Sequence, residues 1–181
     1  MRLALYSSAA VIALAPVGAL AVDYLNVEQA QKLMFPQADA FELRDLPLDA
    51  ALSRQLAAAG VRPLVPLLQV RLARQGGAVL GFVVVDEVIG KFERITYAVG
   101  VEADGRVRQV EVLSYRESHG HEIRLPAWRK QFVGKTAASP LRVGDDIANI
   151  SGATLSCTHV TEGVRRNVVW LDLLRHSGRL S

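Results

Sequence analysis

Residues 150–156 read Ile-Ser-Gly-Ala-Thr-Leu-Ser, a run of small and hydroxyl-bearing residues that follows a polar loop. After this run, apolar residues recur at three- to five-residue spacing, the pattern of a helix with one core face. These residues are Leu155, Val160, Val164, Val168, Leu171 and Leu174. The sequence therefore predicts a final helix that begins near Ala153, with the small residues at its start.

The start of this helix is suited to binding a phosphate group. The first N–H groups of a helix have no partner within it, and its dipole is positive at this end. Gly152 and Ala153 would let an anion approach the backbone, while Ser151, Thr154 and Ser156 add hydroxyl groups. The same residues are equally consistent with an ordinary helix N-cap packed against a sheet.

The chain before the motif has the pattern of an antiparallel sheet. Runs of β-branched and apolar residues predict strands at 64–72, 79–88, 95–101 and 107–115. Gly76-Gly77 and Asp104-Gly105 lie between successive runs and are typical of hairpin turns. Helices are predicted at 27–34, 48–59 and 127–132. We therefore expect one α+β domain, with a central antiparallel sheet flanked by helices and a C-terminal amphipathic helix after Ser-Gly-Ala-Thr.

Composition narrows the class of protein. The 181 residues, 50% of them hydrophobic, suffice for one domain with a substantial core. The 21 basic and 18 acidic residues are interspersed without a basic cluster, so we expect no nucleic-acid partner. The only cysteine, Cys157, cannot form an internal disulfide. His119 and His121 lack the further ligands of a metal site, so no metal is expected.

The N-terminus has the features of an export signal. Arg2 precedes an uncharged run that ends in Ala19-Leu20-Ala21, with small residues where a signal peptidase cleaves. The run is also long enough to span a bilayer if it is retained. We expect residues 1–21 to be a signal peptide or membrane anchor, residues 22–78 the N-terminal helices and first strand, and residues 79–181 the domain core.

A second block of sequence accompanies the motif. Residues 115–120 read Tyr-Arg-Glu-Ser-His-Gly and lead through Trp128, Gln131 and Phe132 to Gly134-Lys135. Together, the two blocks resemble the FMN-binding domain family, which includes the periplasmic flavin subunits of the Rnf and sodium-pumping NADH:quinone oxidoreductase complexes. In that family the last threonine of the motif holds FMN by a phosphoester bond, and a Glu-Thr-Pro-Gly loop lies against the flavin ring.

The resemblance implies a set of cofactor-binding residues. Thr154 would be the site of covalent attachment, made by a flavin transferase that uses FAD. The other residues of the phosphate site would be Ser151, Gly152, Ala153, Leu155 and Ser156, and the ring contacts would be Glu117, Ser118 and Gly120. The chain departs from the family pattern at Ala148, where many members have aspartate, and at Ser118-His119, where Thr-Pro is usual.

The resemblance implies an electron-carrier flavoprotein rather than an independent enzyme. Such a protein would be periplasmic or anchored to the outer face of the cytoplasmic membrane. It would exchange electrons with a membrane oxidoreductase, the quinone pool or a cytochrome. Two alternatives stay open: a stand-alone exported flavin reductase, and a flavin-free binding or sensory module of the same fold. No catalytic residues for an independent reaction are predicted.

Overall fold

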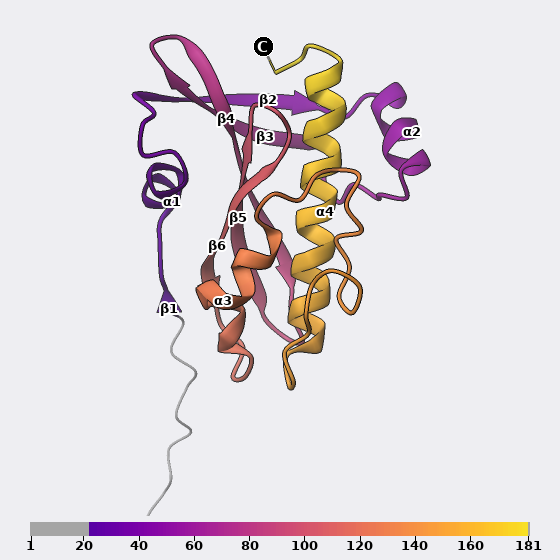
Figure 1. Ribbon diagram of the computed structural model, residues 1–181. Coiled ribbons are helices and arrows are strands. Elements are labelled where there is room, and N and C mark those ends of the chain that lie inside the picture. Colours follow the sequence, from indigo (N-terminus) through magenta and orange to yellow (C-terminus); the bar gives the residue numbers. More distant parts are fainter. Residues whose placement is uncertain (1–21, 181) are drawn as a thin grey trace, which may run out of the picture.

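The computed structural model describes residues 22–180 as one antiparallel sheet with helices on both faces (Figure 1). The predicted signal peptide or anchor, residues 1–21, lies outside the described residues. The sheet has six strands in the order β1-β6-β5-β4-β3-β2. The strands are β1 Val22–Asp23, β2 Ala40–Pro47, β3 Leu67–Gln75, β4 Ala78–Ile89, β5 Arg94–Glu102 and β6 Val107–Tyr115. The helices are α1 Val27–Met34, α2 Ala50–Ala58, η1 His121–Arg124, α3 Pro126–Arg129, η2 Lys130–Phe132 and α4 Thr154–His176.

Strands β3 to β6 form the predicted meander of hairpins. Gln75 pairs with Ala78 across a two-residue turn, in which Gly76 and Gly77 have φ angles of 54° and 86°. Such angles favour glycine, which explains why this turn could be predicted. Strand β3 begins three residues later than predicted because Pro66, directly before it, has no N–H to donate to a ladder.

Alternating side chains of the sheet build two cores. Phe82 and Val84 of β4 face the larger core, which α4 covers, and Val83 faces the smaller core under α1. Asn26 is the N-cap of helix α1, and its side chain accepts the N–H of Gln29 at 2.8 Å. The helix ends at Met34, as predicted. The fold is thus an α+β domain with a central antiparallel sheet.

Helix α4 runs along one face of the sheet (Figure 1). Its side chains Val160, Val164 and Val168 are fully buried, as the periodicity predicts. Asp86 of β4 accepts hydrogen bonds from Arg166 at 2.6 Å and from Asn167 at 2.9 Å, which fixes α4 against the sheet. Among residues 22–180, no helix is both long enough and apolar enough to cross a bilayer.

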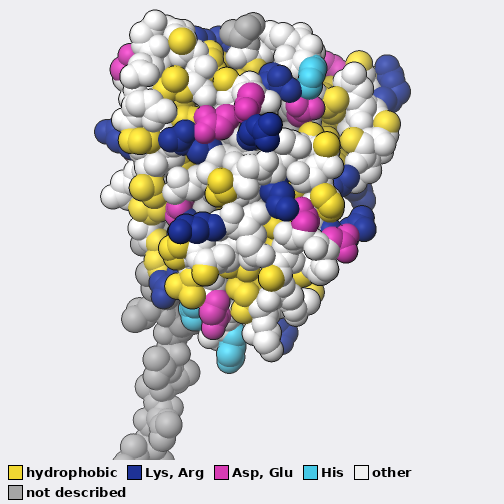
Figure 2. All heavy atoms as spheres, viewed as in Figure 1, with side chains coloured by type: hydrophobic (Ala, Val, Ile, Leu, Met, Phe, Trp, Pro, Cys, Tyr) yellow, Lys and Arg dark blue, Asp and Glu magenta, His cyan; other side chains and the backbone are white. Residues whose placement is uncertain are grey.

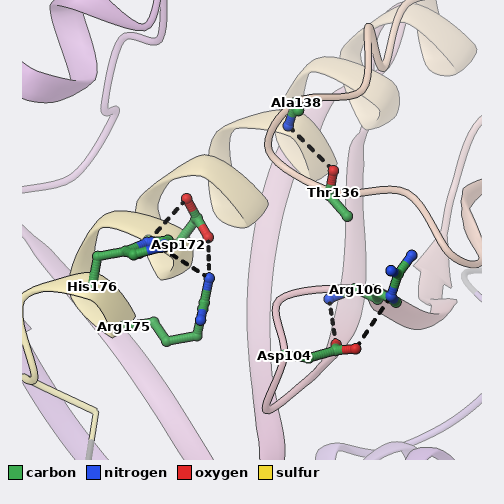
Figure 3. Close-up of polar contacts among 7 residues, drawn as sticks. All are labelled: Asp104, Arg106, Thr136, Ala138, Asp172, Arg175 and His176. Carbon is green, nitrogen blue, oxygen red and sulfur yellow. Dashed lines mark hydrogen bonds and ion pairs between the residues drawn. The ribbon is translucent and has the colours of Figure 1, made fainter.

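The C-terminal end of α4 lies beside the β5–β6 turn. In that turn Asp104 accepts hydrogen bonds from the backbone N–H and the side chain of Arg106 (Figure 3). Near the end of α4, Asp172 pairs with Arg175 at 2.9 Å and approaches His176 at 3.4 Å. These contacts stabilise the end of the helix that is farthest from its motif.

Several parts of the fold differ from the prediction, among them the two-residue edge strand β1, which was not predicted. Strand β2 was not predicted; it is an edge strand in which only Leu46 is buried, so no continuous apolar run marks it. Helix α2 begins after Asp49, which caps it, rather than at Leu48. The helix predicted at 127–132 is divided into α3 and η2.

Candidate functional site

A pocket of about 530 Å³ lies at the N-terminal end of α4. The β4–β5 turn, the loop after β6 and the motif all contribute to it. The residues that line it are Lys91, Phe92, Glu117, Ser118, His119, Gly152, Ala153, Thr154, Leu155 and Ser156. The structure therefore brings most of the predicted cofactor-binding residues to one pocket. Ser151 and Gly120, which were also predicted, are not part of its lining.

The start of α4 is open to an anion. Gly152 has a φ of 82° and turns the chain into the helix, and Ala153 at the N-cap position provides no side-chain hydrogen bond. The first helical bond runs from the N–H of Cys157 to the carbonyl of Ala153, at 2.9 Å. The N–H groups of the first turn thus point out of the helix without a side-chain cap.

The motif hydroxyl groups have different surroundings. Thr154 is exposed, and its Oγ1 accepts a hydrogen bond from Nδ2 of Asn149 at 3.0 Å. Ser156 is buried, with an exposed fraction of 3%, and its Oγ lies 3.3 Å from the Tyr115 hydroxyl. Ser151 is exposed in the turn before the helix.

Thr154 also borders a second pocket, of about 740 Å³. The basic residues that line this pocket include Arg62, Arg142 and Arg165. Arg165 donates to the carbonyl groups of Gly60 and Ala59, and Arg142 pairs with Asp145 at 3.4 Å, whereas Arg62 is exposed. The Thr154 hydroxyl therefore lies where a mostly apolar pocket meets one with basic side chains.

Glu117 connects the loop after β6 to the β4–β5 turn. Its Oε1 accepts the N–H of Phe92 at 2.6 Å and that of Glu93 at 3.0 Å. The side chain is buried, with an exposed fraction of 7%. Burial alone would raise the pKa of the Glu117 carboxyl, but these backbone N–H groups outweigh burial and hold the pKa below its usual value. The carboxylate is thus ionised at neutral pH and fixes the turn beside the pocket.

Gly120 lets the same loop pack against the start of α4. A Cβ at this position would lie 2.5 Å from the Cβ of Ala153, and the φ of 83° also favours glycine. The Tyr115 hydroxyl donates to the carbonyl of His119, and this hydrogen bond fixes the loop to the end of β6. Gly120 therefore allows the loop to pack closely against α4, although Gly120 itself does not line the pocket.

The chain before the motif is held by the short helices α3 and η2. Trp128 donates from Nε1 to the carbonyl of Ala148 at 2.8 Å, and Gln131 accepts the N–H of Ala148 at 2.7 Å. Both backbone groups of Ala148 are thus fixed by side chains from the second sequence block. This contact explains why an aromatic helix accompanies the motif.

Sequence reasoning did not identify several residues of the pocket region. Phe92 and Lys91 line the pocket from the β4–β5 turn, and Asn149 holds the Thr154 hydroxyl. In the sequence, Gly90-Lys91 before β5 marks that turn. Cys157, by contrast, is fully buried, and burial raises the pKa of its thiol. Residues 22–180 contain no group of three His, Cys, Asp or Glu placed to hold a metal ion.

Comparison with known proteins finds a matching family model and related proteins. Residues 90–169 match the model of the FMN-binding domain. The chain is 29% identical over 184 residues to a subunit of the ion-translocating oxidoreductase complex of Aliivibrio fischeri (strain MJ11), covering 93% of this chain and 86% of the relative. The corresponding protein of A. fischeri strain ATCC 700601 / ES114 matches equally, at 29% identity over 93% of this chain and 86% of its own length.

The fold also resembles a solved structure. The crystal structure of Shewanella oneidensis NqrC superposes with a TM-score of 0.53 at 16% identity, covering 90% of this chain and 83% of that chain. At this identity the likeness concerns the fold. The motif, the loop that carries Glu117 and the turn after Gly90 all lie within the matched segment. Residues 90–169 thus match the model of the FMN-binding domain family, in agreement with the resemblance of the sequence motifs.

Proposed function

We propose that this protein is an extracytoplasmic electron-transfer flavoprotein whose FMN is bound covalently through its phosphate to Thr154. One observation carries the proposal: within an FMN-binding domain, the exposed Thr154 hydroxyl lies at an uncapped helix start and lines the pocket that also contains the Glu117 loop. The proposed cofactor-binding residues are Ser151, Gly152, Ala153, Thr154, Leu155, Ser156, Glu117, Ser118 and Gly120.

The pocket fits the two chemically different parts of FMN. A phosphate on Thr154 would meet the N–H groups of the first turn of α4, and Arg62 of the adjoining pocket supplies positive charge. The apolar side chains of Phe92, Ala153 and Leu155 suit a flat aromatic ring, and about 530 Å³ lies within the usual range for small-molecule sites.

FMN, when bound, supplies reversible electron transfer, and the protein holds and orients it. We propose that attachment uses FAD and a flavin transferase. The Oγ1 of Thr154 forms a bond to the phosphorus of the FMN half, the bond between the two phosphates breaks, and AMP and the hydroxyl proton leave. Asn149 donates to Oγ1, so the hydroxyl keeps its own proton for this exchange.

We propose a membrane oxidoreductase, the quinone pool or a cytochrome as the redox partner. The relatives from A. fischeri are named as subunits of an ion-translocating oxidoreductase complex, which supports a partner of this kind. We further propose that residues 1–21 direct export as a signal peptide or anchor, that residues 22–78 form the N-terminal part of the domain, and that residues 79–181 form the FMN-binding core.

Coexpression with a flavin transferase tests the covalent link. The protein should stay fluorescent on a denaturing gel and gain the mass of FMN less one water on the peptide that contains Thr154. Thr154→Val should abolish the label with little loss of stability, since the shape is nearly unchanged and water can replace the exposed hydrogen bond. Thr96→Val makes the same change at a threonine of β5 that does not line the pocket; it is the matched control and should keep the label.

The same preparations separate the alternatives. Yellow protein that loses all flavin on denaturation would contradict the covalent link, and Ala148→Asp would then test whether the family aspartate restores it. Colourless protein would favour a flavin-free module. Saturable turnover of a preferred small acceptor would favour a stand-alone reductase, because a carrier is oxidised with little selectivity.

A further inference from the structure

The β4–β5 turn presents an aromatic side chain at the edge of the pocket. Phe92 is 75% exposed, the highest value among the exposed large hydrophobic residues of the described chain. Leu155, from the first turn of α4, is 46% exposed and lines the same pocket. On the face shown in Figure 2, hydrophobic side chains are scattered among charged ones of both signs. An aromatic group left so exposed beside a pocket needs a physical explanation.

The position of Phe92 is fixed by the backbone rather than by packing of its ring. Its N–H donates to the buried Glu117 carboxylate at 2.6 Å, and the turn is closed by a bond from the N–H of Gly90 to the carbonyl of Glu93 at 2.8 Å. The Nζ of Lys91 lies 4.9 Å from the centroid of the Phe92 ring. A buried charge thus holds the turn while the aromatic ring stays exposed to solvent.

We propose that Phe92 stacks on the isoalloxazine ring of FMN attached at Thr154, with Leu155 as a second apolar contact. This inference rests on the proposed function. The flavin ring is flat and aromatic, and offset stacking on Phe92 removes apolar surface of both groups from water. Because Thr154 lines the same pocket, the phosphoester makes stacking an intramolecular event with a high effective concentration, so a weak contact is sufficient.

The arrangement separates two tasks. The start of α4 holds the phosphate, and the β4–β5 turn orients the ring. Loss of the Phe92 side chain should therefore free the flavin ring without releasing the cofactor. Lys91, which also lines the pocket, places a positive charge beside the ring site and favours the reduced, more negative form of the cofactor.

Fluorescence of the attached flavin tests the inference, because tryptophan in contact with a flavin quenches its emission by electron transfer whereas phenylalanine does not. Phe92→Trp should lower the emission per attached flavin several-fold. Leu43→Trp is the matched control: Leu43 is 52% exposed and lies on β2, separated from β4 by β3, so its emission should equal that of the parent. Phe92→Ala should increase quenching of the flavin by added iodide.

Labelling on a denaturing gel is measured first for every variant. Absence of label in the parent protein would refute the covalent link of the proposed function, on which this inference rests. Full labelling with equal emission from Phe92→Trp and Leu43→Trp would refute stacking and leave covalent attachment intact. Unchanged iodide quenching in Phe92→Ala, together with slower electron exchange with membrane vesicles, would also refute stacking and assign Phe92 to docking of a redox partner.

Discussion

Replacing Glu117 by glutamine should destabilise the flavin-free protein at neutral pH. The amide keeps the shape of the side chain and can still accept the N–H groups of Phe92 and Glu93, but it removes the charge. A hydrogen bond to a charged group contributes roughly 1.5–3 kcal/mol and a neutral one roughly 0.5–1.5 kcal/mol. The two bonds together should therefore lose about 2 kcal/mol, which for a domain of this size lowers Tm by about 4–8 °C.

The destabilisation should depend on pH. The folded protein holds the pKa of Glu117 below its usual value, so the ionised carboxylate contributes stability at pH values above the unfolded pKa of about 4.3. This contribution is lost as the pH falls through the folded pKa. The difference in Tm between the parent and Glu117→Gln should be full at pH 7 and should shrink as the pH falls below about 4.

Thermal unfolding followed by circular dichroism, from pH 7 to pH 3, measures both effects. Glu93→Gln is the matched control, since Glu93 is an exposed carboxylate on the same turn. Its Tm should stay close to that of the parent. Equal Tm values for the parent and Glu117→Gln at pH 7 would refute the assignment of Glu117 as the group that fixes the turn. A difference that persists undiminished at pH 3 would show that the charge of the carboxylate is not responsible.

Two further predictions concern attachment and export. Asn149→Ala should slow transfer of flavin to Thr154 by about two- to tenfold, the range expected for one lost hydrogen bond, at an unchanged Tm; equal labelling time courses would show that Asn149 does not position the hydroxyl. Mass analysis of protein recovered outside the cytoplasm should find Val22 as the new N-terminus. Intact Met1 on membrane-bound protein would establish an anchor instead. A cytoplasmic location would contradict export.

The meander could be predicted because its strands are buried and its turns have special backbone angles. The run from Ala78 to Ile89 is apolar along most of its length, and the glycines before it specify a tight turn. Strand β2 lacked such signals. It pairs only with β3, and Glu42, Arg44 and Asp45 leave it without an apolar run. Its position depends on pairing with a partner that a single sequence does not reveal.

The prediction for Leu155 was wrong in one respect. It was placed on the core face of α4, but 46% of its surface is exposed. With 3.6 residues per turn, a residue nine positions before Val164 lies about 180° away around the helix. The five-residue step from Leu155 to Val160 already broke the helical period. Leu155 therefore points away from the core, and it lines the pocket instead.

The positions of Phe92 and Asn149 at the pocket could not be predicted, because each depends on contacts between separate segments. Phe92 is fixed by Glu117, which lies on the far side of β5 and β6 in the sequence. Asn149 is placed by the contacts that Trp128 and Gln131 make with its neighbour Ala148. Sequence patterns indicate burial and turns, whereas these contacts follow from the complete topology.

The environments of the motif hydroxyl groups support Thr154 as the proposed attachment residue, and this argument is independent of family resemblance. Ser156 is buried and its hydroxyl lies against Tyr115, so a transferase could not reach it without unfolding the first turn of α4. Ser151 is exposed but does not line the pocket. Thr154 is exposed, lines the pocket and stands in the first turn, where a phosphate on its oxygen would meet uncapped N–H groups. Of the three, it alone satisfies both access for the transferase and stabilisation of the attached phosphate.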